Sequence, residues 1–261
     1  IDGFALWEEN AENKPNISDG LYLWVENAEP PYDQFASYLV WNPIGATYIE
    51  GSSRPFDGVI PACSGFWVTA LNKGGNGNGN SGGNSVKDLL FTNKMRLTNG
   101  LDLSNTKTVK NNVAEIQRQR AWFTLTTDAN NYDQILIGEH PRATDSIDLI
   151  YDARMNPGSS KVIFASINDS VPFTIQGFAP KIGIDTSYIP LLVATADSTQ
   201  HYITLDSVLY FKDSKKFYLV DSIQGTSTLL TLKNPVPITL DTTGEYLSRF
   251  YLKVVTNIPL N

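Results

Sequence analysis

The sequence predicts an all-β protein, an antiparallel β-sandwich or jelly-roll-like fold made of two packed β segments. Short apolar runs recur along the chain, and clusters of Gly, Pro, Asn and Asp separate them, as expected for strands joined by turns. Helical periodicity is nearly absent. With 261 residues and 41% hydrophobic content, the chain is long enough to bury a substantial core.

Strands are predicted where apolar runs lie between turn signals. Runs 208–211 and 217–220 flank the charged stretch Lys-Asp-Ser-Lys-Lys and predict a hairpin. The run 116–127 alternates at period two, which predicts a half-exposed strand with Arg118 and Arg120 on its solvated face. The predicted strands are residues 21–25, 37–41, 65–71, 89–97, 116–127, 134–138, 161–167, 173–178, 191–196, 202–211, 216–220, 227–232 and 246–255.

Local propensity favours a helix only over residues 4–13. Residues 97–114 are polar and rich in turn formers, so they predict a boundary between a first β segment (1–112) and a second β-sandwich segment (113–261). One continuous sandwich with a long crossover is the alternative. Within the first segment, the Gly/Asn-rich tract 73–84 predicts an exposed, flexible loop.

Charge and composition exclude several classes of partner. A formal charge of −7 and a pI of about 4.8 argue against nucleic acid and anionic lipid, because phosphates would be repelled. No apolar run approaches the roughly 20 residues that span a bilayer, so membrane insertion is not expected. The single cysteine, Cys63, excludes an internal disulfide framework and is expected to be a small buried residue.

No catalytic or metal-binding motif stands out, so we expect a protein without enzyme activity or cofactor. Asp197, Ser198 and His201 are the right residue types for a triad, but neighbours along a strand point to opposite faces. Residues 128–139 faintly resemble a calcium loop. Asp133 occupies the position where that loop needs Gly, which favours a polar turn before a strand.

Three stretches and one tryptophan resemble a known family. The resemblance is to the β-rich module that precedes the C-terminal sorting domain in Bacteroidota surface proteins exported by the type IX secretion system. It implies an extracellular or cell-surface, non-catalytic β module. The matching residues are 58–96, GVIPACSGFWVTALNKGGNGNGNSGGNSVKDLLFTNKMR; 133–152, DQILIGEHPRATDSIDLIYD; 246–255, YLSRFYLKVV; and Trp41.

The chain also departs from that family. Such modules usually begin with a Trp-containing strand that ends in an Asn-Pro-Tyr-Pro-like turn, whereas this sequence starts at Ile1-Asp2-Gly3. No sorting domain follows Asn261. We therefore expect the chain to be a piece of a longer precursor.

Six of the eighteen aspartates precede Ser or Thr and then a small aliphatic residue or Thr. Bacteroidota O-glycosylate exported proteins at this type of sequon, so the resemblance implies glycosylation. The alternative is that these pairs are ordinary turn residues whose side chains cap the neighbouring backbone. The candidate sites are Ser146, Ser170, Ser198, Ser207, Ser222 and Thr242.

The aromatic residues raise the question of sugar stacking. Trp67 lies in a continuous apolar run and is expected to pack in the core or at a sheet edge. Trp7 and Trp122 are the candidates for an exposed stacking role, although core packing is favoured even for them. In the same region, Phe66 is expected to face the core, with Gly65 allowing a conformation or close approach that a Cβ would obstruct.

The leading hypothesis is a non-catalytic structural or adhesive module of a secreted, cell-surface or extracellular-matrix/filament protein. Its partners would be other copies of itself, other surface proteins or glycans. A missing first strand would expose a sheet edge that another subunit's strand could fill. The alternative is a carbohydrate-binding module of a secreted polysaccharide-degrading enzyme.

Overall fold

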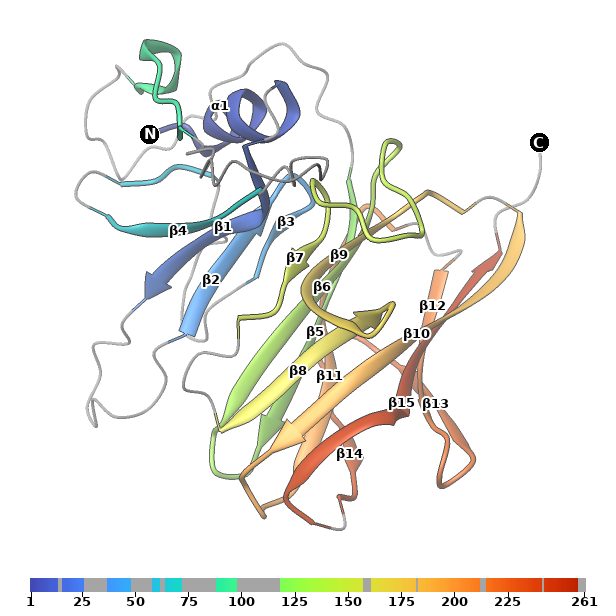
Figure 1. Ribbon diagram of the computed structural model, residues 1–261. Coiled ribbons are helices and arrows are strands. Elements are labelled where there is room, and N and C mark those ends of the chain that lie inside the picture. The colour runs from blue at the N-terminus through green and yellow to red at the C-terminus, as the bar shows by residue number, and fades with distance from the viewer. Residues whose placement is uncertain are drawn as a thin grey trace, which may run out of the picture.

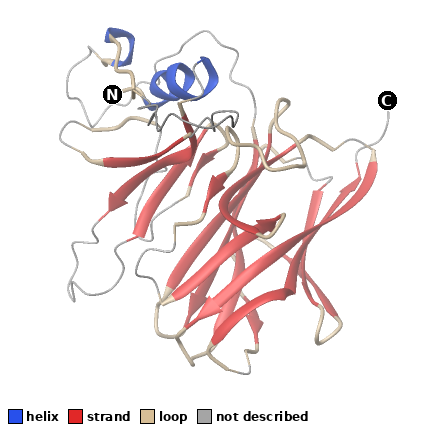
Figure 2. Ribbon diagram, in the orientation of Figure 1, coloured by secondary structure: helices blue, strands red, loops and turns tan. Residues whose placement is uncertain are grey.

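The computed structural model describes residues 1–13, 16–25, 37–47, 58–61, 64–71, 88–97, 118–156, 161–181, 183–211, 215–240 and 242–257. In this part of the chain nearly all regular structure is β, which confirms the all-β prediction. The strands form two sheets, one small and one large (Figures 1 and 2). Cys63 and the loop 73–84 lie outside the described residues.

The N-terminal part of the chain forms a four-stranded antiparallel sheet in the order β3-β2-β1-β4. Helix α1 (Gly3–Trp7) begins after Asp2, whose carboxylate accepts hydrogen bonds from the N–H groups of Phe4 and Ala5, as N-cap residues do. A π-helical stretch, Glu8–Asn13, continues it, which confirms the predicted helix. The strands are β1 (Ile17–Val25), β2 (Ser37–Asn42), β3 (Gly45–Ala46) and β4 (Phe66–Ala70).

Helix α1 packs its apolar side chains on this small sheet. Trp7 is buried, and its ring meets the Trp41 ring edge to face at 6.3 Å. Met95, in a 3-10 turn (Asn93–Met95), joins the same cluster. The predicted strand 89–97 is therefore wrong, because no neighbouring strand of the described chain pairs with it and only Met95 is buried there.

The rest of the chain forms an eleven-stranded sheet in the order β13-β12-β15-β10-β8-β9-β6-β5-β11-β14, with β7 paired to β9. Neighbouring strands are antiparallel except β6 and β9, which are parallel. The strands are β5 (Gln119–Thr127), β6 (Tyr132–Glu139), β7 (Ala153–Arg154), β8 (Val162–Asn168), β9 (Val171–Phe178), β10 (Ile184–Thr195), β11 (His201–Leu209), β12 (Lys215–Asp221), β13 (Thr226–Leu230), β14 (Val236–Ile238) and β15 (Gly244–Asn257).

Strand β14, at one end of this order, pairs with β11, and the chain just beyond β13, at the other end, also reaches β11. A bridge joins Leu205 of β11 to Leu232, just beyond β13, and the Lys233 N–H donates to the Leu205 carbonyl at 2.9 Å. The sheet thus curls into a nearly closed, barrel-like sandwich around the main hydrophobic core. The buried phenylalanines of this core are Phe123, Phe164, Phe217 and Phe250.

This closure explains why the hairpin predicted from residues 208–220 is wrong. Strand β11 pairs with β5 and β14, whereas β12 pairs with β13 and β15. Strand β12 instead forms a hairpin with the next strand, β13, and the partners of β11 are distant in sequence. A charged stretch between two apolar runs marks a chain reversal, but it does not decide which strands become neighbours.

The small sheet packs on the outer face of the large one. The Trp122 indole N–H donates to the Ala46 carbonyl at 2.8 Å, and the Asn42 side-chain amide donates to the Tyr151 carbonyl at 2.9 Å. A buried cluster is shared by the two sheets. It comprises Tyr22, Val40, Ile44, Trp122, Leu136, Ala143, Tyr151, Ala153 and Ile175.

Strand β5 is consequently buried on both faces. The guanidinium of Arg118 lies over the Phe4 ring and that of Arg120 over the Trp122 ring, so the predicted solvated face is covered by the small sheet and its helix. The two sheets lie on either side of the predicted boundary between 1–112 and 113–261. Division into two independent domains stays a prediction, because the cluster shared by the sheets joins them.

Candidate functional site

Both histidines have structural surroundings. His140 is buried and stacks on the Tyr151 ring, and its burial lowers its pKa to about 4. His201 is also buried, with Nε2 at 2.8 Å from the Thr195 hydroxyl. No group of three or more His, Cys, Asp or Glu side chains in the described chain is placed to hold a metal ion.

The Asp197-to-His201 segment forms a turn instead of a relay. The Asp197 carboxylate accepts hydrogen bonds from the Thr127 hydroxyl, the Asn131 amide and the Thr199 N–H. Burial alone would raise its pKa, but these donors outweigh that effect and lower the pKa to about 2. The carboxylate is thus committed to capping the turn between β10 and β11.

The segment 128–139 is not a cation loop. Residues 132–139 form strand β6, and the Asp133 carboxylate accepts hydrogen bonds from the N–H groups of Gln134 at 2.8 Å and Phe164 at 2.7 Å. These contacts tie β6 to β8 through the side chain. The interpretation as a polar turn before a strand is confirmed.

The two tryptophans proposed for sugar stacking are not on the surface. Trp7 and Trp122 are each only 1% exposed, because Trp7 packs from α1 onto the small sheet and Trp122 lies between the two sheets. Both therefore pack in the core, as the favoured interpretation predicts, and neither offers a stacking surface. Trp67, expected to pack, is instead 65% exposed on edge strand β4. Its neighbour Phe66 is half-buried against the small-sheet cluster.

Gly65 does not have the role predicted for it. A Cβ added there would meet nothing within 4 Å, and the residue does not adopt a positive φ. The glycine therefore permits no close approach that alanine would prevent.

The outer face of β10, β15 and β12 carries a row of aromatic and basic side chains that are exposed or half-buried. Inward residues such as Ile189 and Leu252 belong to the core, so their neighbours along each strand point outward. Tyr188 pairs with Lys253, and Lys253 pairs with Tyr218 on its other side. These three side chains therefore lie in one line across three strands.

We name this surface the tyrosine–lysine face and define it as Tyr188, Tyr218, Tyr251, Lys216 and Lys253. The Lys253 ammonium lies between two rings, 5.9 Å from the centroid of Tyr188 and 5.5 Å from that of Tyr218. Tyr188 is 55% exposed. Tyr251 stands two residues from Lys253 on β15, in the next row, and Lys216 stands two residues from Tyr218 on β12.

This arrangement suits recognition of a flat, polar ligand. Tyrosine rings offer rigid apolar area with a polar tip at low entropic cost. Two strand spacings of about 4.8 Å put Tyr188 and Tyr218 about 10 Å apart, a span comparable with two linked sugar rings. The lysines add charge beside the rings.

Sequence reasoning missed this face because no single segment carries it. The alternation Tyr251, Lys253, Val255 is visible within the predicted strand 246–255, but it does not distinguish an outward face from an inward one. The aromatic line exists only once register places Tyr188 and Tyr218 on either side of Lys253.

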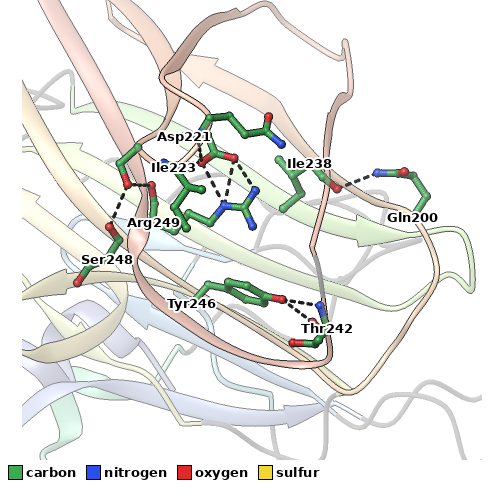
Figure 3. Close-up of polar contacts among 10 residues, drawn as sticks. Gln200, Asp221, Ile223, Ile238, Thr242, Tyr246, Ser248 and Arg249 are labelled. Carbon is green, nitrogen blue, oxygen red and sulfur yellow. Dashed lines mark hydrogen bonds and ion pairs between the residues drawn. The ribbon is translucent and has the colours of Figure 1, made fainter.

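A buried ion pair anchors the opposite end of β15 (Figure 3). Arg249 Nη2 contacts Asp221 Oδ2 at 2.8 Å, and Arg249 Nε lies 3.1 Å from both carboxylate oxygens. Both side chains are more than nine-tenths buried. Nearby, the Tyr246 hydroxyl accepts a hydrogen bond from the Thr242 N–H at 3.0 Å, which fixes the turn that precedes β15.

The sequon residues lie mainly in turns. Ser146, Ser170, Ser198, Ser222 and Thr242 are exposed, whereas Ser207 is half-buried within β11. Asp197 and Asp221 cap the backbone of their turns, as the turn alternative predicts. The Ser222 hydroxyl donates to the Arg249 carbonyl. Exposure would allow modification at five sites, and O-glycosylation stays a prediction.

One small cavity opens between β11 and the β12–β13 pair. Its volume is about 200 Å³, and its walls include Leu205, Phe211 and Leu230. Lys215 lies at its border, but the lysine side chain is 1% exposed and forms an ion pair with Glu139. Lys216 also lines the cavity, which is a mostly apolar gap at the seam of the barrel-like sheet.

Comparison with known proteins gives one match. No curated protein and no solved structure matches the chain. None of the helices in the described residues is long and apolar enough to cross a membrane. The family model described as "Domain of unknown function (DUF8693)" matches residues 2–254, nearly the whole sequence, so the chain belongs to the DUF8693 family.

Proposed function

We propose that this chain is a non-catalytic adhesive module of a secreted or cell-surface protein, and that its tyrosine–lysine face contacts carbohydrate. The observation that carries the proposal is the line formed by Tyr188, Lys253 and Tyr218 across three paired strands. Sugar rings present C–H faces that stack on aromatic rings, and their hydroxyls bond to tyrosine hydroxyls and ammonium groups.

A rigid sheet is a suitable support for such a surface. The backbone of β15 is paired on both sides along this region, with β10 and with β12. The rings therefore need little ordering on binding, which reduces the entropic cost of association. The carbohydrate-binding site of the alternative hypothesis would therefore lie on this face and not at Trp7 and Trp122.

The test is retention on immobilised polysaccharides. Tyr188→Ala and Tyr218→Ala should each weaken binding about tenfold, which corresponds to about 1.4 kcal/mol for a central aromatic contact. Phe91→Ala is the matched control, because it removes an exposed aromatic that lies outside the tyrosine–lysine face. Equal binding by wild type and both tyrosine variants would contradict the assignment of the face.

An extracellular address is supported by the resemblance to modules exported by type IX secretion. Five of the sequon residues lie in exposed positions, which supports O-glycosylation of the native protein. Intact-mass and glycopeptide measurement of material from its natural source tests this directly. A mass that equals that of the unmodified chain at all six sites would contradict it.

Self-association is a second candidate function, and one observation favours it. Among the described strands, β4 pairs only with β1, and an edge strand of this kind favours strand addition. Trp67 projects from the same strand. Light scattering over a concentration series should show oligomers that Trp67→Lys reduces, and a strictly monomeric wild type would exclude this route.

A further inference from the structure

The charge on the tyrosine–lysine face points to a specific class of ligand. We propose that this face selects anionic polysaccharides, those with a carboxylate on the sugar ring, and that Lys253 determines this specificity. The inference rests on the proposed function, since it names the ligand class for the same surface. The observation that supports this inference is the distribution of charge on the sheet.

No acidic residue lies in the three rows of paired residues that make up the face. The central row is Tyr188, Lys253, Tyr218 and Leu229, and the rows on either side follow from the same register. The chain as a whole carries a formal charge of −7, so a surface with only basic charge is a departure from its surroundings. The flanking rows are Thr186, Val255 and Lys216, and Pro190, Tyr251, Val220 and Ser227.

The lysines of the face also differ from three other lysines of the described chain. Lys181, Lys215 and Lys233 form ion pairs with Asp145, Glu139 and Asp206. Within the described chain, neither Lys216 nor Lys253 has a carboxylate within ion-pair distance. Their charges are therefore available to a ligand.

The position of Lys253 ties charge to ring stacking. Its ammonium lies between the rings of Tyr188 and Tyr218, about 5.5 to 5.9 Å from their centroids. A sugar stacked on either ring would bring a ring carboxylate next to this ammonium. A charged contact of this kind is stronger than a hydrogen bond between neutral groups, so the carboxylated sugar would be preferred over its neutral counterpart.

Charge density favours polysaccharide over nucleic acid. A polynucleotide carries a phosphate at every nucleotide, and a protein of net negative charge repels such a polymer at long range. The face offers only two lysines to offset that repulsion. A polysaccharide with spaced carboxylates makes the same local contact with a smaller long-range penalty.

The experiment compares two polymers that differ only in charge. Binding to polygalacturonate and to its fully methyl-esterified form is measured by calorimetry at low and physiological salt. Wild type should bind the carboxylate polymer at least tenfold more tightly. Lys253→Gln should lose this preference and keep binding to the ester, whereas Tyr188→Ala should weaken binding to both. Lys94→Gln, at an exposed lysine elsewhere, should behave like wild type.

The outcomes separate the two proposals. Equal binding of the two polymers by wild type, with loss of both in Tyr188→Ala, would overturn the charge inference and leave the proposed function standing. No polysaccharide binding by wild type would overturn the proposed function itself. Further experiments measure binding to dextran sulfate, to poly(dT) and to vesicles of anionic lipid. Tighter binding to any of these than to polygalacturonate would overturn the carboxylate assignment. Thermal melts confirm that each variant is folded.

Discussion

Gly138 of β6 and Gly177 of β9 are paired in register, and the side chain of Ile44 fills the space above both. Ile44 lies in the turn between β2 and β3 and is fully buried. The two glycines thus form a recess on the large sheet into which the small sheet inserts one side chain. This contact helps to explain why the sheets pack closely at this point.

Substitution of Gly138 by alanine should therefore loosen the junction between the sheets. An added Cβ would lie 2.4 Å from Ile44 Cγ2 and 3.2 Å from the Gln119 carbonyl oxygen, so backbone or side chain must shift. We expect a loss of about 1 to 3 kcal/mol in the free energy of unfolding, measured by urea denaturation. Gly65→Ala is the control and should be nearly neutral, because its Cβ meets open space.

A double-mutant cycle distinguishes this contact from a general effect on β6. Ile44→Ala alone should cost about 2 to 5 kcal/mol through lost burial and the cavity left behind. Combined with Gly138→Ala it should cost clearly less than the sum, because the clashing methyl group is gone. Strict additivity would show that Ile44 does not limit the space at Gly138.

The buried pair Arg249–Asp221 should be intolerant of removal of its acid. Asp221→Ala leaves a buried guanidinium without its carboxylate, at a cost of about 3 to 5 kcal/mol. Arg249→Met in the same chain should restore part of this loss. Asp145→Ala breaks the exposed pair with Lys181 and should cost less than about 1 kcal/mol. Equal effects of the two aspartate substitutions would contradict the assigned difference in burial.

The contribution of Asp152 to stability should fall as pH rises from about 4 to about 7. Burial, with a smaller contribution from the charges of Asp148 and Asp19, raises the pKa of Asp152 to about 7, against an ordinary value of 3.8. Between these values the folded protein holds a proton that the unfolded chain has lost, so unfolding becomes easier with increasing pH, by at most about 1.4 kcal/mol per pH unit for this group.

Asp152→Asn should reduce that slope, because the amide stays neutral throughout. Asp169→Asn is the matched control: Asp169 is exposed in a turn with φ of +47°, a conformation that asparagine also adopts. Urea midpoints at pH 5 and pH 8 provide the measurement. The prediction is wrong if wild type and Asp152→Asn show the same difference between the two pH values.

Adjacent residues on β4 should respond differently to truncation. Phe66 packs against the small-sheet cluster and is half-buried, so Phe66→Ala should cost about 1 to 3 kcal/mol, less than for a fully buried ring. Trp67 is 65% exposed, and Trp67→Ala should change stability by less than about 0.5 kcal/mol. The reverse order of effects would mean that β4 is turned with its other face toward the cluster.

Much of the fold was accessible from the sequence because strand formation is largely a local matter. Alternation and turn residues located most of the strands, including the closing strand that the structure extends to Gly244–Asn257. The N-terminal helix was accessible for the same reason. The polar turn before β6 could be distinguished from a calcium loop, because the loop requires Gly where Asp133 stands.

Only the tertiary structure decided which faces are buried and which strands are neighbours. Trp122 and Arg120 show the alternation of a half-exposed strand, yet the small sheet covers them. Tyr188 and Tyr218 belong to different predicted segments and become one surface only through their register with Lys253. Local pattern sets the conformation of a segment, whereas burial and pairing depend on contacts between residues far apart in the chain.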